Sequence, residues 1–447
     1  MPDNSGDGAR GAGITRRLFF ARSAQVGAVV TAAGGLGGVL DACGSSGSGA
    51  AGGRPTLTVQ SNLTDAPVVK ALQETVSRYN ASKASTGTAV LNTVASPTFV
   101  AQLPTYLTES NPPNALLYWA GHASQQFGGK GYLLDLSSIW DTTLKGYSPA
   151  MRTLATDSHG QQIFVPQSYY WWGIFYRKSL FRKWGVTPPT TWAQFLDVCA
   201  KIKKKGVHPL VTSAQAPEPW PFVGWFDYLD LRINGAQYHL DLLHGKHSFD
   251  SPQVRKVFTY LASIMPYFDP ASSSYAYQDA ATPLVQGTAG MYLMGALVTG
   301  VVPASVIPDL GFFKFPLIDP SVPDAEEAPT NGYMASAKTG HPAQTRNLLA
   351  FLVSNEAQEI YSNVSQTSAF PVSPTAKLAN LTPMEQQGLA MLRQAKTLTQ
   401  FFNRDSSDAL QTTNYNAMEA FWQNPRNISS MLSSWQAAAA KVLQQQA

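Results

Sequence analysis

Aromatic side chains next to polar ones occur at several points of the chain, and their chemistry suits the binding of a sugar. Trp119 ends an apolar run, Trp220 stands between two prolines, and Tyr170 and Trp171 belong to a run of four aromatic residues. A sugar presents apolar C–H faces and hydroxyl edges, so its site needs flat rings together with hydrogen-bonding groups. These residues therefore favour ligand binding.

Three polar residues follow the first predicted strand, 57–60, and offer hydrogen bonds to hydroxyl groups. They are Asn62, Thr64 and Asp65, placed just before a predicted helix at 66–80. An alternative interpretation is that they cap this helix, because Asn, Thr and Asp are favoured at helix N-termini. The sequence leaves both roles open.

Two other kinds of chemistry are disfavoured. A glycoside hydrolase would need two carboxylates around one bond, and acidic residues are sparse, with 28 Asp and Glu in 447 residues. His239, His244 and His247 with Asp241 could suggest a metal site, but their spacing does not form one helical face. We expect a solvated hairpin there, with no metal and no cofactor.

Composition indicates a globular protein. Hydrophobic residues make up 44% of the chain, charged residues 13%, and the formal net charge is +4. High hydrophobicity with low net charge argues against disorder. The longest run of like charge is 203–205, three lysines, which argues against nucleic-acid binding. Cys199 lies at helical spacing with apolar neighbours, so we expect a buried, unreactive thiol.

The N-terminal region has the features of an export signal. The run Thr15–Phe19 resembles a twin-arginine motif. The uncharged stretch 23–40 leads into Leu-Asp-Ala-Cys at 40–43, which looks like a bacterial lipobox. We therefore expect residues 1–42 to be a signal peptide, Cys43 to carry the lipid, and 43–54 to form a Gly/Ser-rich tether. The protein would then be held at the outer face of the cytoplasmic membrane. The alternative is an uncleaved membrane anchor.

Strands and helices alternate along the remaining chain, which predicts an α/β architecture with mostly parallel sheets. Thr191 and Gln194 form a predicted capping box for the helix that contains Cys199. Strands are expected at 57–60, 115–119, 162–166, 173–176, 291–294 and 310–315, and further helices at 66–80, from 252, at 345–353 and at 428–443.

Five stretches resemble the extracellular solute-binding proteins of bacterial ABC importers, in the carbohydrate-binding group that includes maltose-binding protein. They occur in the family's order, which makes the resemblance specific although each is weak alone. The stretches are Ala115–Leu136, Phe175–Trp192, Ser248–Pro252, Gln286–Gly295 and Gly311–Pro316.

The resemblance implies a two-lobed clamshell fold with crossing hinge strands. It divides the chain into lobe 1 at 55–170, lobe 2 at 171–309, a return to lobe 1 at 310–372 and C-terminal helices of lobe 2 at 373–447. It implies a non-enzymatic, monomeric protein that captures a mono- or oligosaccharide and delivers it to a membrane permease. A polyol, a glycerophosphodiester or a peptide is the alternative ligand.

The resemblance also implies which residues line the cleft. Glu218 and Trp220 match a Glu-Pro-aromatic motif whose carboxylate and ring contact the sugar. One departure is that Ala296 and Leu297 stand where maltose-type proteins have a stacking Trp. The full implied set is Asn62, Thr64, Asp65, Trp119, Tyr170, Trp171, Glu218, Trp220, Gly295, Asn331, Gly332, Tyr333 and Asp408.

Overall fold

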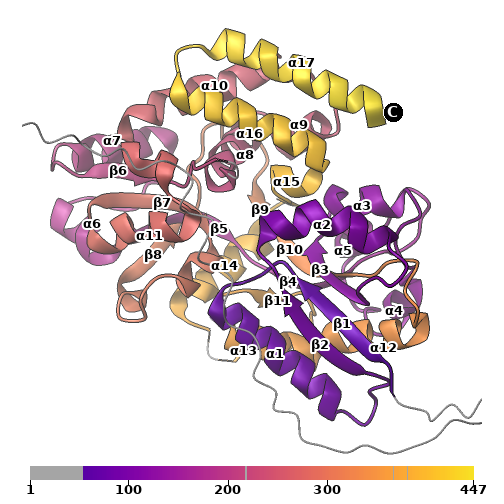
Figure 1. The fold of residues 1–447 in the computed structure, drawn as a ribbon. Helices are drawn as coiled ribbons and strands as arrows, with labels where there is room; N and C mark the ends of the chain where they lie inside the picture. Colours follow the sequence, from indigo (N-terminus) through magenta and orange to yellow (C-terminus); the bar gives the residue numbers. More distant parts are fainter. Residues whose placement is uncertain (1–53, 217–218, 366, 380, 447) are drawn as a thin grey trace, which may run out of the picture. The chain divides into compact units, whose positions relative to one another are not determined.

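Two β-sheets, each with its own hydrophobic core, organise the part of the chain that the computed structural model describes: residues 54–216, 219–365, 367–379 and 381–446. The first sheet has the strand order β11-β4-β10-β3-β1-β2 and the second has the order β6-β7-β5-β8 (Figure 1). We call the regions around these sheets the first and the second lobe. The two-lobed α/β fold expected from the sequence is confirmed.

The first sheet combines parallel and antiparallel pairs. β1 is parallel to β2 and β3, whereas β10 is antiparallel to β3 and β4, and β11 is antiparallel to β4. Its strands are β1 (Thr56–Ser61), β2 (Thr88–Thr93), β3 (Ala115–Trp119), β4 (Val165–Tyr169), β10 (Thr330–Met334) and β11 (Phe370–Pro371).

The second sheet is also mixed. β6 is parallel to β7, but β5 is antiparallel to both β7 and β8. Its strands are β5 (Trp172–Arg177), β6 (His208–Val211), β7 (Ala289–Gly295) and β8 (Leu310–Phe313). The expectation of mostly parallel sheets is therefore wrong. Helical crossovers produce parallel neighbours, whereas β5 and β10 each enter their sheet directly from another strand, without a crossover helix, and run against their neighbours.

The chain passes between the lobes through short segments. Tyr170 and Trp171 alone separate β4 of the first sheet from β5 of the second. β9 (Ala325–Glu327), which precedes β10, forms a small sheet with β12 (Thr397–Thr399). The expected return to lobe 1 at residue 310 is too early, because β8 pairs with β5 in the second sheet. The first sheet is re-entered only at β10.

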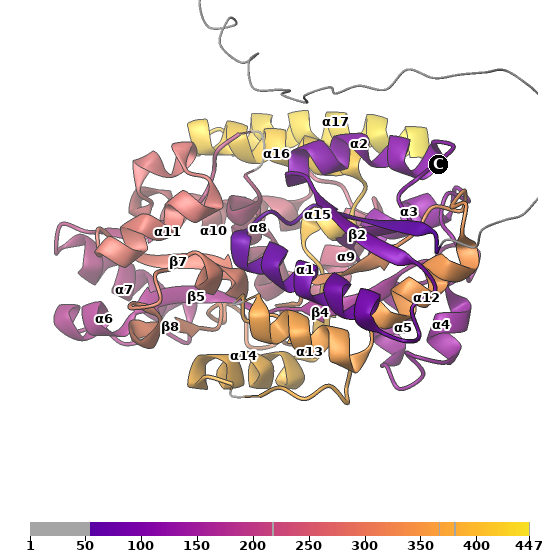
Figure 2. The same cartoon turned by 60° about the horizontal axis from the view of Figure 1, so that its bottom comes forward.

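The helices of the first lobe pack against its sheet. α1 and α13 lie side by side along this lobe (Figure 2). The helices of this region are α1 (Ala66–Ala81), α2 (Ser96–Thr108), α3 (His122–Gly128), α4 (Ser137–Asp141), α5 (Pro149–Leu154), α12 (Pro342–Leu352) and α13 (Asn355–Val364). The helix predicted at 345–353 thus begins earlier, at a proline suited to a first turn.

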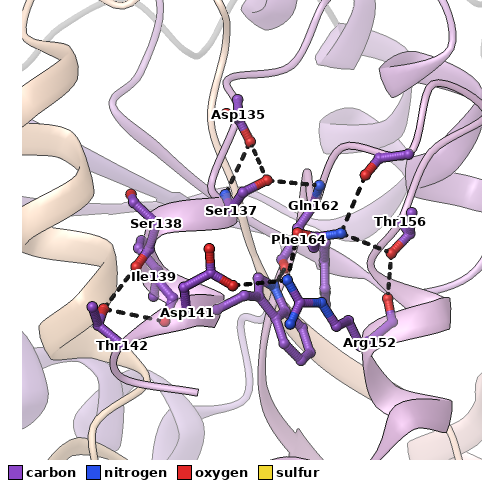
Figure 3. A network of polar contacts seen from close by, with 12 residues as sticks. Asp135, Ser137, Ser138, Ile139, Asp141, Thr142, Arg152, Thr156, Gln162 and Phe164 are labelled. Carbon is purple, nitrogen blue, oxygen red and sulfur yellow. Dashed lines mark hydrogen bonds and ion pairs between the residues drawn. The ribbon is translucent and has the colours of Figure 1, made fainter. Parts of the chain in front are cut away.

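A polar network holds α4 and α5 together at the edge of the first lobe (Figure 3). Arg152 donates to Asp141 Oδ1 at 2.9 Å and to Gln162 Oε1 at 3.1 Å. Its guanidinium also lies 5.9 Å from the centre of the Trp140 ring, and Trp140 Nε1 donates to the Phe164 carbonyl. The network therefore fixes this edge to the segment that leads into β4.

The second lobe contains most of the helices. The predicted capping box of α7 is confirmed, because Thr191 and Gln194 make both reciprocal bonds, and Cys199 is fully buried as expected. The helices are α6 (Lys178–Trp184), α7 (Trp192–Lys203), α8 (Trp220–Ile233), α9 (Ala236–Leu243), α10 (Pro252–Ile264), α11 (Tyr277–Gln286), α14 (Pro383–Gln394), α15 (Phe402–Asp405), α16 (Asp408–Gln423) and α17 (Ile428–Gln446). Short 3₁₀ turns lie at Met265–Tyr267, Pro270–Ser274, Ala296–Gly300 and Ile307–Asp309.

The C-terminal helices belong to the core of the second lobe. α16 and α17 pack against each other (Figures 1 and 2), and Phe421 and Trp435 are buried with Phe258 of α10. The apolar spacing predicted for 428–443 therefore faces this core. Within the described ranges, no helix combines the length and the apolar character that crossing a membrane requires.

The segment with three histidines is only in part solvated as expected from the sequence. His244 and His247 follow α9 and are exposed. His239 lies within α9 and is fully buried, with Nδ1 2.9 Å from Asp230 Oδ2, so no hairpin forms at that residue. Within the described part of the chain, no group of three or more His, Cys, Asp or Glu side chains is arranged to hold a metal ion.

Candidate functional site

A cavity of about 420 Å³ lies between the two lobes. The first lobe contributes the loop after β1 and the end of β3, and the second contributes the N-terminal ends of α8 and α11. Ligands of α/β sheets commonly bind where strands end, and both β1 and β3 end at this cavity. The crossing segment between β4 and β5 also lines it, so lobe movement would change its width.

Part of the predicted cleft set comes together here. Seven of the predicted residues line the cavity, and they come from both lobes and from the crossing segment. They are Asn62, Thr64, Asp65, Trp119, Tyr170, Trp220 and Asn331.

Asp65 occupies the N-cap position of α1, but its side chain caps no backbone group. Its carboxylate accepts hydrogen bonds from the Tyr277 hydroxyl and, at 3.4 Å, from Gln278 Nε2 of α11. Both donors belong to the second lobe. The Asp65 side chain therefore makes no capping bond and instead joins the second lobe at the cavity wall.

Aromatic rings form the second-lobe side of the cavity. The centre of the Trp220 ring lies 5.9 Å from that of Trp172, at an interplanar angle of 76°, and 5.4 Å from that of Tyr277. Trp172 in turn packs on Phe401, with centres 4.2 Å apart. Trp220 is the first residue of α8, with prolines on both sides, which limits its backbone freedom.

Arg404 of α15 lines the cavity and makes contact with β10 and with the crossing segment. Its Nη1 donates to the Thr330 carbonyl and to Asn331 Oδ1, both at 3.1 Å, and its Nη2 donates to the Tyr170 hydroxyl at 3.3 Å. The guanidinium lies 5.4 Å from the centre of the Trp119 ring. Burial lowers the pKa of Arg404 from its ordinary value, and the nearby Tyr170 partly opposes this. Burial also raises the pKa of Tyr170.

Unmatched polar atoms remain in the cavity wall. Asn62 Nδ2 and Asn403 Oδ1 are buried and have no hydrogen-bond partner among the described residues. Because buried polar groups are normally hydrogen-bonded, this donor and this acceptor indicate a wall that still has hydrogen-bonding capacity. Among the described lining residues, Asp65 and Arg404 are the charged ones.

The structure places Trp171 in the core and not in the cleft. Its ring is fully buried, stacks on Phe370 with centres 5.2 Å apart, and lies against Phe312. Tyr170 and Trp172 face the cavity instead. Alternate residues of an extended segment point to opposite sides, so the pair that the sequence analysis favoured, Tyr170 and Trp171, could not both face the cleft.

Four further predicted residues do not line the cavity. Tyr333 is fully buried in the first core, and a Cβ on Gly332 would lie 2.2 Å from the Val165 carbonyl oxygen. These two residues therefore serve the close pairing of β10 with β4. Gly295 ends β7, where a Cβ would lie 2.6 Å from the Tyr170 ring. It makes room for a cavity side chain without lining the cavity itself.

Asp408 is the fourth of these residues. It begins α16 outside the cavity wall. Burial raises the pKa of its carboxyl to about 6, and the nearby Tyr118 hydroxyl and Lys130 partly oppose this. Glu218, predicted to contact the ligand, and Cys43, predicted to carry the lipid, lie outside the described residues.

Several lining residues were missed by the sequence analysis. Alternation along the crossing segment could have identified Trp172. Tyr277 and Gln278 begin a helix of the second lobe, and no local pattern places them opposite Asp65. Arg404 carried no signal beyond its proximity to a predicted cleft segment. The missed lining residues with polar or aromatic side chains include Trp172, Ser213, Gln215, Tyr277, Gln278, Tyr361, Phe401, Asn403, Arg404, Gln411 and Tyr415.

Comparisons with known proteins agree with this geometry. Residues 62–359 match the model of the bacterial extracellular solute-binding protein family. An uncharacterized ABC transporter extracellular-binding protein of Pyrococcus horikoshii is 22% identical over 69% of this chain and 71% of its own length. A probable sugar-binding periplasmic protein of Mesorhizobium japonicum is 26% identical over 45% of this chain, a match that spans 49% of that relative.

A solved structure is similar over most of the chain. It is that of the bacterial solute receptor AcbH, described as having an exclusive substrate preference for β-D-galactopyranose. The two chains are 26% identical, with a TM-score of 0.82, over 88% of this chain and all of the other. With a family match over well more than half of its residues, a two-lobed fold and a cavity between the lobes, this chain belongs to the bacterial extracellular solute-binding proteins.

Proposed function

We propose that this protein captures a sugar in the cavity between its lobes and delivers it to the permease of an ABC importer. The lining residues support a sugar rather than a purely apolar ligand. Rings at Trp119 and Trp220 offer flat apolar surfaces, and polar groups of both lobes line the same cavity. Rings of this kind suit the C–H faces of a pyranose, while hydroxyl groups need donors and acceptors.

The observation that carries the proposal is that each lobe contributes both an aromatic ring and a polar group to the cavity. Trp119 and Asp65 belong to the first lobe, and Trp220 and Tyr277 to the second. A ligand that contacts both sets is bound more tightly when the lobes are closed. Its binding would therefore favour the closed arrangement of the lobes. Capture by lobe closure requires no bond breaking, so the proposed role is non-enzymatic.

The proposed setting is the outer face of the cytoplasmic membrane. The export motif at 15–19 and the Leu-Asp-Ala-Cys sequence before Gly44 support a lipid-anchored protein, which we propose acts as a monomer. Lipid attachment at Cys43 and a tether at 43–54 would keep the folded lobes near the permease. Multiple acyl chains are needed for a stable anchor of this kind.

A thermal-shift screen tests the proposal. The panel contains D-galactose, D-glucose, D-xylose, N-acetyl-D-glucosamine, their β-linked disaccharides, glycerol, sorbitol, glycerophosphocholine and tripeptides. A ligand at 100 times its dissociation constant stabilises the folded state by about 2.7 kcal/mol. We expect a shift with at least one sugar and none with the phosphodiester or the peptides.

The same samples separate binding from hydrolysis. Incubation with the disaccharides followed by chromatography should return them unchanged. A shift with the peptides or the phosphodiester alone would contradict a sugar ligand. Released monosaccharide would contradict the non-enzymatic role.

A further inference from the structure

The hydrogen bonds of Arg404 have a direction that constrains its neighbours. A guanidinium only donates, so every polar atom it contacts must be an acceptor. The atom of Asn331 that faces Arg404 is therefore the amide oxygen, which settles the orientation of this side chain. The same reasoning makes the Tyr170 oxygen an acceptor toward Arg404.

These contacts use one lone pair of each oxygen and turn the polar hydrogens of both side chains away from Arg404. With its oxygen used by Arg404, Asn331 retains its Nδ2 hydrogens, for which the described residues provide no acceptor. Tyr170 retains its hydroxyl proton in the same way. Both residues line the cavity and are nearly buried, at 8% and 7% exposure. We call Arg404, Asn331 and Tyr170 the Arg404 wall.

Arg404 is held in place by more than these bonds. Its guanidinium lies over the rings of Trp119 and Tyr170, at 5.4 and 5.9 Å from their centres. Among the described residues, the hydrogen bonds of its guanidinium reach no carboxylate. A carboxylate partner would have used the guanidinium in a bidentate pair. Its donors instead reach neutral acceptors of the wall.

We infer that Arg404 is a positioning residue that directs the donors of this wall into the cavity, and that the wall thereby favours a ligand oxygen that accepts without donating. In a free pyranose the ring oxygen is the atom with this property, since every hydroxyl group can also donate. Placing the ring oxygen against the wall leaves no ligand proton without an acceptor. This inference rests on the proposed function and specifies how the sugar is oriented in the cavity.

The test compares each sugar with its carbocyclic analogue. D-galactose, D-glucose and D-xylose are each titrated by calorimetry beside the corresponding 5a-carba sugar, in which a methylene replaces the ring oxygen. A methylene cannot accept, so the wall donors would lose their partner on binding. We expect the native protein to prefer the pyranose by at least about tenfold.

Two variants separate positioning from general damage. Asn331→Asp keeps the shape, pairs with Arg404 and removes the Nδ2 donor, so the preference should fall to about twofold or less while the apo protein stays folded. Arg404→Met should lower the preference in the same way, because Asn331 and Tyr170 lose their fixed orientation. Arg393→Met and Asn363→Asp are exposed changes of the same type and should leave the preference unchanged.

The outcomes are distinguishable. If a pyranose and its carba analogue bind the native protein equally, the inference is overturned while the sugar-binding function stands. If the wall variants weaken both ligands by the same factor, Arg404 has only a structural role and the inference fails. If no sugar of the panel binds, both the proposed function and the inference are overturned.

Discussion

Tyr277 of the second lobe donates a hydrogen bond to the carboxylate of Asp65 in the first lobe. The two residues are 212 positions apart, and each begins its helix: Asp65 is the N-cap of α1 and Tyr277 is the first residue of α11. Their contact joins the lobes at the cavity wall. Burial and the Asp65 carboxylate raise the pKa of Tyr277, so the phenol remains protonated and able to donate.

Tyr277→Phe should weaken ligand binding by roughly tenfold or more. The change removes a hydrogen bond to a charged acceptor, worth about 1.5–3 kcal/mol, from the closed arrangement of the lobes. Calorimetry gives the affinity, and X-ray scattering with saturating ligand should show a larger radius of gyration than in the native complex. Tyr275→Phe is the matched control, because the Tyr275 hydroxyl bonds Asp269 within the second lobe. Equal effects of both changes would contradict a role for the interlobe contact.

Trp220→Ala should reduce affinity by at least about thirtyfold, since truncating a buried aromatic anchor costs about 2 kcal/mol or more. The ring packs mainly on Trp172 and Tyr277, which also line the cavity. The apo melting temperature should therefore change little. Trp422→Ala serves as the comparison, because Trp422 packs on Phe222 and Phe268 away from the cavity. That variant should lose stability and retain affinity, and the reverse pattern would remove Trp220 from the site.

The unfolding free energy should fall as pH rises between 6.5 and about 9. Burial alone would lower the pKa of His239, but its hydrogen bond to Asp230 and the charges of Asp230, Asp227 and Glu327 raise it to about 9. Because this pKa lies above the ordinary value of 6.5, the folded state binds more protons within that interval and loses stability as they leave. Urea unfolding across the interval measures the slope.

His239→Gln should flatten this slope, although the same variant loses stability at lower pH. Burial also raises the pKa of Asp227, from 3.8 to about 7, which adds a further loss of stability as pH rises through this lower interval. His208→Gln is an exposed control and should leave the profile unchanged. An unaltered slope in His239→Gln would assign the pH dependence to other groups.

Cys43→Ser should release the protein from the membrane into the soluble fraction, because the proposed lipid-bearing sulfur is lost. Fractionation of producing cells followed by immunoblotting measures the distribution. Cys199→Ala is the matched control, since that thiol is buried in α7 and inaccessible to lipidation. Membrane retention of the Cys43 variant would indicate that the stretch 23–40 anchors the protein instead.

Local patterns in the sequence were enough to place most elements. The capping box at Thr191, the proline start of α10 and the apolar spacing of α17 depend on neighbours within a few residues, and the structure has all three. The strand predicted at 162–166 lies three residues further on, as β4. Its position is decided by pairing with β10, which is about 165 residues away.

The sequence indicated the fold class and seven of the residues that line the cavity, through strand ends, aromatic runs and the resemblance to the family. Only the tertiary structure decided that Trp172 faces the cavity and Trp171 the core, that Tyr277 meets Asp65, and that Arg404 lies behind Asn331. Each of these facts depends on how segments from different lobes are brought together. Periodicity and capping act within a few residues, whereas contacts between lobes arise from long-range packing that no local pattern specifies.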